Sequence, residues 1–184
     1  MRKMIVLLVV FALCILPAAS KGMKKASPEE KRARINEMAD ATIQELLAES
    51  PGAKELFGKA YGYAVFDNLK LSLMISGGGG QGVAVNRGSG ARTYMKMGTV
   101  GLNIGLGGQK YQLVFLFQDS KRFNDFVEHG WQADAQANAV AGTEGASKGT
   151  TFKNGMAVYM ITEAGLMLQA DIAGTKYWKS KLNK

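Results

Sequence analysis

The chain is nearly devoid of the side chains that carry metal and thiol chemistry. Its 184 residues include one cysteine, Cys14, and one histidine, His129. Cys14 lies within an apolar N-terminal run, so a protein processed after that run has no disulfide, thiolate nucleophile or cysteine metal site. A histidine metal cluster is excluded, and a Ser-His-Asp triad would depend wholly on His129. We expect His129 to have a structural role at the end of a helix, where an imidazole interacts favourably with the dipole.

Carboxylates are also too scattered to suggest an active site. They show neither the spacing of a paired-carboxylate site nor that of a calcium loop. The scattered residues are Asp67, Asp119, Asp125, Asp134, Glu144, Glu163 and Asp171. No P-loop pattern occurs either. We therefore expect no enzymatic activity, no catalytic residue, no metal and no cofactor.

Long hydrophobic runs are absent apart from the segment from Met4 to Leu16. It is shorter than the roughly 20 residues that span a bilayer, and it follows Arg2 and Lys3. Small residues at 18–20 complete the pattern of a secretory signal peptide over residues 1–20. Leu13 precedes Cys14 where lipoprotein processing requires a small residue, which argues against lipidation. We expect an exported protein, periplasmic or peripheral on the inner or outer membrane.

Charge of one sign gathers at the two ends of the chain. The net charge is +8, but residues 35–175 hold eleven basic and thirteen acidic residues. The predicted basic lead-in, 21–26, and the residues after it contribute Lys24, Lys25, Lys31, Arg32 and Arg34. A possible second patch, which runs into the basic tail 180–184, contributes Lys176, Lys179 and Lys181. Basic ends attract anionic phospholipid, whereas export argues against a nucleic-acid partner. The alternative is that these charges serve solubility alone.

Three helices are expected from local signals. Ser27-Pro28-Glu29-Glu30 forms a capping box before a stripe of apolar residues with helical spacing. Ser50-Pro51-Gly52 should end that helix, and a short helix should cover 53–59. Asp119 should cap a third helix whose Phe123, Phe126 and Val127 point inward. The stripe should pack on the core of the domain, and a sharper hypothesis also places this helix on a membrane.

From Tyr61 onward, alternation and abundant glycine predict strands. The predicted strands cover 63–66, 71–76, 82–85, 91–97, 101–107, 111–117, 131–141, 155–161, 165–172 and 174–178. With few crossover helices, this indicates an α+β fold. We expect a strongly curved, mostly antiparallel, barrel-like sheet of about nine or ten strands, with the N-terminal amphipathic helix and one further helix packed on it.

A glycine run interrupts this region with the sequence GGGGQG. A dinucleotide site needs such a run to open a helix, but Val83-Ala84-Val85-Asn86 follows here. We expect instead a glycine-rich loop at a bend between paired strands. Its glycines are Gly77, Gly78, Gly79, Gly80 and Gly82. Ten methionines suit core filling, or alternatively a lipid-lined pocket.

Four segments resemble one family in order and spacing. They are YGYAVFDNLKLSLMISGGGGQGVAV (61–85), MGTVGLNIGLGGQKYQLVFLF (97–117), QADAQANAVAG (132–142) and AGLMLQADIAGTKYW (164–178). Together they resemble the SYLF domain, over about residues 27–179. Departures are Asp67, where the family often has proline after the phenylalanine, and the lack of SH3 or FYVE modules. The domain also occurs in yeast and animal actin regulators and in secreted bacterial proteins.

The resemblance implies lipid binding without catalysis. Eukaryotic members are associated with phosphoinositides and actin, neither of which suits a bacterial periplasm, so only affinity for anionic lipid transfers. It implies a lipid surface formed by the N-terminal helix and its lead-in, with Lys24, Lys25, Lys31, Arg32 and Arg34. Two alternatives remain: a cell-envelope scaffold that binds a protein partner through the glycine-rich loop, and a carrier that encloses a lipid chain.

Overall fold

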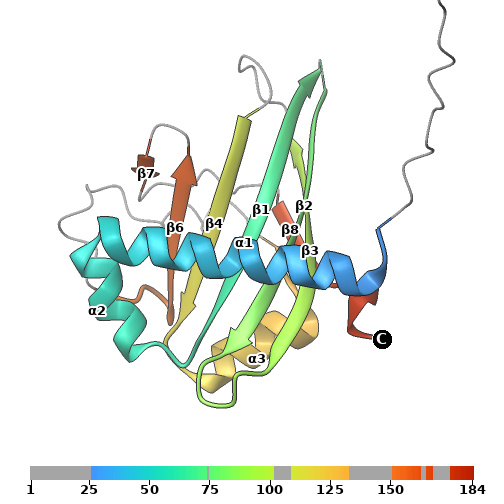
Figure 1. Cartoon of the computed structure of the whole chain (residues 1–184). Helices are drawn as coiled ribbons and strands as arrows, with labels where there is room; N and C mark the ends of the chain where they lie inside the picture. Colours follow the sequence, from blue (N-terminus) through green and yellow to red (C-terminus); the bar gives the residue numbers. More distant parts are fainter. Residues whose placement is uncertain (1–25, 74, 102–108, 133–150, 163–164, 168–174) are drawn as a thin grey trace, which may run out of the picture.

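The computed structural model describes residues 26–73, 75–101, 109–132, 151–162, 165–167 and 175–184 (Figure 1). The helices are α1 (Pro28–Glu49), α2 (Pro51–Lys59), α3 (Ser120–His129) and the 3-10 turn η1 (Lys181–Asn183). The strands are β1 (Gly62–Leu73), β2 (Ile75–Asn86), β3 (Arg92–Gly101), β4 (Gln109–Phe117), β5 (Trp131–Gln132), β6 (Met156–Thr162), β7 (Gly165–Met167) and β8 (Thr175–Lys179). The predicted signal peptide, Lys24 and Lys25 lie outside the described residues. None of the described helices has the length and apolar character needed to cross a bilayer.

The strands form one antiparallel sheet in the order β5-β8-β3-β2-β1-β4-β6-β7. The α+β class is confirmed, but the described sheet has seven strands of three or more residues plus the two-residue β5. It is open rather than barrel-like, because the outermost strands β5 and β7 do not pair with each other. The prediction of nine or ten strands was too high partly because β1 and β2 form one long hairpin. The predicted strand 71–76 includes the end of β1 at Leu73 and the start of β2 at Ile75. Of the predicted strands 101–107 and 131–141, only Gly101, Trp131 and Gln132 are described.

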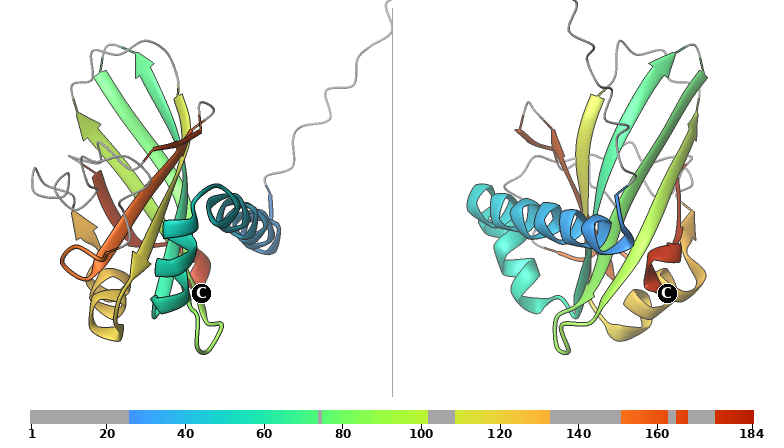
Figure 2. Two further views of the ribbon diagram at one scale, coloured as in Figure 1. Left: turned by 90° about the vertical axis from the view of Figure 1, so that its left-hand side faces the viewer. Right: turned by 45° about the vertical axis from the view of Figure 1, so that its right-hand side comes forward.

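Helices cover both faces of this sheet. Figure 2 shows α1 and α2 against one face, here called the outer face, and α3 against the opposite, inner face. Side chains alternate along β1, so Val65 joins the core under α1 whereas Ala64 and Phe66 join the core beside α3. The inner core is rich in aromatic rings. The centroid of the Phe115 ring lies within 6 Å of the ring centroids of Phe66, Phe126 and Tyr177. Burial raises the pKa of Tyr159 to about 12 and that of Tyr177 well above 10, so both phenols stay neutral near pH 7.

The predicted helix signals are confirmed. At α1, the Ser27 hydroxyl accepts from the Glu30 amide at 3.1 Å, and the Glu30 carboxylate accepts from the Ser27 amide at 2.8 Å. At α3, the Asp119 carboxylate accepts from the Arg122 amide at 2.9 Å, and His129 is the last helical residue. The short helix begins two residues earlier than predicted, because the Ser50 hydroxyl accepts from the Ala53 amide and thereby caps α2.

The glycine run is not the loop that the sequence suggested. Residues 77–80 and 82 lie inside β2, paired with β1 on one side and β3 on the other. An added Cβ at Gly82 would lie 2.2 Å from the Val65 carbonyl oxygen, and one at Gly80 would lie 2.3 Å from that of Asp67. Close approach of two strands, not a turn, therefore requires glycine at these two positions. Because β2 does not open a helix, the run lacks the geometry of a dinucleotide site.

The remaining strand predictions are confirmed where the residues are described. β6 and β7 form the expected hairpin, and β8 matches the predicted last strand. Met95, Met97 and Met156 are buried in the inner core, where they fill space among the aromatic rings.

Candidate lipid-binding site

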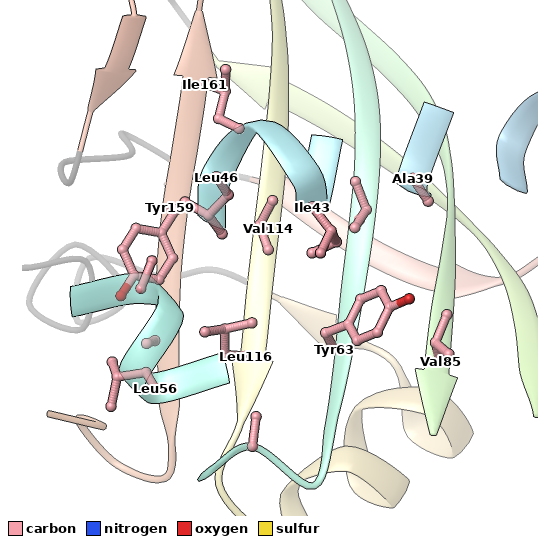
Figure 3. Packing of buried hydrophobic residues seen from close by; sticks show 14 of the residues in the cluster. Ala39, Ile43, Leu46, Leu56, Tyr63, Val85, Val114, Leu116, Tyr159 and Ile161 are labelled. Atoms are coloured by element: carbon pink, nitrogen blue, oxygen red, sulfur yellow. The ribbon is translucent and has the colours of Figure 1, made fainter. Parts of the chain in front are cut away.

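The apolar stripe of α1 is packed on the domain. Ile35, Ala39, Ile43 and Leu46 are buried against the outer face of the sheet, and Figure 3 shows three of them, Ala39, Ile43 and Leu46, above β1, β2, β4 and β6. This confirms the expectation that the stripe packs on its own core. Any membrane contact made by the docked helix must therefore use its polar sides.

Polar contacts fix α1 over β3. The Arg92 guanidinium donates to the Asp40 carboxylate at 2.9 Å and to the Asn36 side-chain oxygen at 3.0 Å. Near the start of α1, Arg32 donates to the Leu182 carbonyl at 2.8 Å. The N-terminal half of α1 thus lies beside the C-terminal η1, as Figure 1 also shows.

A groove lies between this half of α1 and the β1–β2 hairpin. We call it the α1 groove; its cavity volume is about 430 Å³. Lys31 and Arg34 line it from α1, and Asp67 and Gln81 line it from the sheet. Gly79 and Gly80 also line it. Gly79 lies on the same face of β2 as Gln81 and has no side chain, so β2 leaves the groove open beside the helix.

Cations and a carboxylate face this groove without neutralising one another. No ion pair within 4.0 Å joins Lys31, Arg34 or Asp67 to any residue that the structure describes. Lys31 is half-buried, while Arg34 and Asp67 are exposed. The groove therefore presents positive charge from its helical wall and negative charge from its strand wall to solvent.

A row of exposed side chains continues from the groove across two more strands, β3 and β8. Asp67 is the register partner of Gln81, Gln81 of Lys96, and Lys96 of Trp178. We call these four residues the polar row. Tyr177 points into the inner core, so its neighbour Trp178 points to the outer face, the side that α1 covers. With strands about 4.8 Å apart, the row connects the groove to an exposed indole on β8.

The predicted basic residues divide between this surface and structural contacts. Lys31 and Arg34 line the groove, and Lys176 is exposed two residues from Trp178 on the same face. Arg32 is engaged in structural contacts instead. Its guanidinium donates to the Leu182 carbonyl and pairs with the Glu29 carboxylate at 2.8 Å. Lys181 is exposed on η1.

The prediction of one C-terminal basic patch was wrong for Lys179. Its ammonium pairs with the Glu128 carboxylate of α3 at 2.6 Å, on the inner side of the sheet. Lys176 and Lys179 are three residues apart on one strand, so their side chains point to opposite faces.

None of the four residues of the polar row was predicted from the sequence as a site residue. Trp178 is 41% exposed, which is unusual for so large an apolar side chain in this domain. The alternation within Thr175–Lys179 could have placed it opposite Tyr177. The neighbours Gln81 and Lys96 depend on strand register, which no local pattern in the sequence specifies.

Metal chemistry has no support in the described part of the chain, where no group of three or more His, Cys, Asp or Glu residues could hold an ion. The groove offers two cations, one carboxylate, one amide and an adjoining apolar wall. Such a set can bind a small charged group at the end of an apolar chain.

Comparison with known proteins finds a relative that matches most of this chain. No family model matches the chain. It is 49% identical over 170 residues to a protein of Aeromonas veronii named Beta cell expansion factor A. The match covers 90% of this chain, which spans only 65% of the relative's length.

Proposed function

We propose that this protein is a SYLF-like, non-enzymatic module that binds phospholipid surfaces through its outer face. The observation that carries the proposal is the joining of the α1 groove to the polar row. Two groove cations without a carboxylate partner among the described residues lie at one end, and Trp178 with Lys96 and Lys176 lies at the other.

The physical basis is electrostatic attraction combined with an interfacial indole. Each Lys or Arg near an anionic leaflet contributes about 1 kcal/mol. Tryptophan favours the headgroup region, where an apolar ring and an N–H group both find suitable surroundings. Both features lie on the face of the docked α1, so binding requires no release of its buried stripe. The name of the Aeromonas relative specifies no ligand, so the proposal rests on this surface.

Cosedimentation of the purified protein with vesicles tests this function. We expect pelleting with phosphatidylcholine vesicles that contain phosphatidylglycerol, and weaker pelleting with phosphatidylcholine alone. Binding to the anionic vesicles should fall as salt is raised, because exposed charges are screened. Absence of binding, or equal binding to both vesicles at either salt concentration, would contradict the proposal. A protein partner identified by crosslinking in intact cells would then favour the envelope-scaffold alternative.

A further inference from the structure

We propose that the α1 groove selects a phosphoethanolamine headgroup, with Lys31 and Arg34 holding the phosphate and Asp67 holding the primary ammonium. This inference rests on the proposed function and specifies its lipid. Its basis is the arrangement of opposite charges on the two walls of one groove.

The carboxylate distinguishes this groove from a simple anion site. Asp67 is exposed, lines the same cavity as the two cations, and forms no ion pair with any described residue. A purely anionic headgroup in the groove would be repelled by it. A zwitterion with phosphate and ammonium joined by two carbons satisfies both walls at once.

Hydrogen bonding favours a primary ammonium over a trimethylammonium. A primary ammonium has three N–H donors, and the Asp67 carboxylate and the Gln81 amide oxygen can accept from it. A choline headgroup has no N–H to donate, so it gains attraction to Asp67 without these directed bonds. Charge-assisted hydrogen bonds are stronger than neutral ones, which gives the groove a means of discrimination.

The rest of the groove suits the remainder of such a lipid. The missing side chain at Gly79 leaves room for a small headgroup, and Ile35 and Met38 add apolar surface beside it. Lys96 and Lys176 lie outside the groove lining, where neighbouring anionic headgroups can bind. The proposal therefore assigns one zwitterionic lipid to the groove and anionic lipids to the surrounding face.

Matched vesicles test the selection. Both types contain the same fraction of phosphatidylglycerol, and the remainder is either phosphatidylethanolamine or phosphatidylcholine. We expect the wild type to bind the phosphatidylethanolamine vesicles about 5-fold more tightly, the factor expected for one directed hydrogen bond that only the primary ammonium can donate. Asp67→Asn should abolish this preference while retaining binding to the phosphatidylcholine mixture. The control variant Glu49→Gln removes an exposed carboxylate outside the groove, so it should keep the preference for phosphatidylethanolamine.

The outcomes separate the two proposals. If neither vesicle binds, the proposed function fails. If both bind equally, or if Asp67→Asn keeps the preference, the headgroup assignment fails while membrane binding stands.

A soluble headgroup excludes effects of bilayer packing. Glycerophosphoethanolamine should shift the amide NMR signals of Gly79, Gly80 and Gln81 in the wild type and not in Asp67→Asn. Glycerophosphocholine should shift them less. Equal shifts with both compounds, or no shift with either, would overturn the proposal.

Discussion

Reversing the two groove cations, with Lys31→Glu and Arg34→Glu, should lower the affinity for anionic vesicles by at least about 30-fold. Loss of two cations that each contribute about 1 kcal/mol accounts for this factor, and the introduced carboxylates add repulsion. The fold should survive, because neither residue pairs with a described carboxylate and a glutamate at position 31 suits the N-terminal part of α1. Arg32 is left intact since it holds η1. Vesicle titration and thermal unfolding provide the two readouts.

The matched control is the pair Lys54→Glu and Lys153→Glu. Both lysines are exposed, and neither lines the groove. The control changes the net charge by the same amount, so it separates a local site from the overall charge of the protein. We expect it to lose much less affinity. An equal loss in both double variants would show that binding depends on total charge and not on the groove.

The second large effect concerns stability, at the closest approach of β1 and β2. Gly82→Ala should lower the free energy of unfolding by about 3 kcal/mol, the upper part of the usual range for overpacking. The new methyl group would lie 2.2 Å from the Val65 carbonyl oxygen and 2.4 Å from the Phe66 ring. Both neighbours belong to a buried strand, so the hairpin must deform to admit it. Urea unfolding measures the loss.

Gly79→Ala is the control for this variant. It adds the same methyl group to the same strand, but the nearest atom is the Met97 carbonyl oxygen at 3.9 Å. We expect a change of less than about 0.5 kcal/mol. Equal stability of Gly82→Ala and Gly79→Ala would contradict the close contact between the two strands.

Local signals in the sequence were sufficient for the helices. Ser27 and Glu30 form the predicted capping box, and Asp119 caps the helix that buries Phe123 and Phe126. These interactions join residues three or four positions apart, so the printed sequence contains both partners in one window. The antiparallel character of the sheet also followed, because the strands lie close together in sequence with few helices between them.

The long hairpin formed by β1 and β2 could not be predicted because a glycine run is compatible with two different structures. Glycine favours turns by its backbone freedom, and it permits close strand contact by its missing side chain. The run from Gly77 to Gly80 suggested the first, whereas the structure uses the second at Gly80 and Gly82. Only the position of β1, which sets Asp67 opposite Gln81, decides between them.

The same limit applies to the site. Helical spacing made Lys31, Arg32 and Arg34 candidates, but it could not show that Arg32 reaches η1, 150 residues away in sequence. The groove exists because α1 crosses a hairpin whose register places Asp67 and Gln81 on the outer face. Such contacts between distant segments depend on the whole sheet, and no local pattern encodes them.

Fluorescence quenching of Trp178 by brominated phospholipid tests most directly whether this face meets the membrane. The two tryptophans are Trp131, which packs against the inner core, and Trp178, which is exposed on the outer face. With anionic vesicles that contain the brominated lipid, we expect strong quenching in the wild type and little in Trp178→Phe. If vesicles bind while the quenching is the same in both proteins, Trp178 does not enter the headgroup region and the outer face is not the lipid-binding surface.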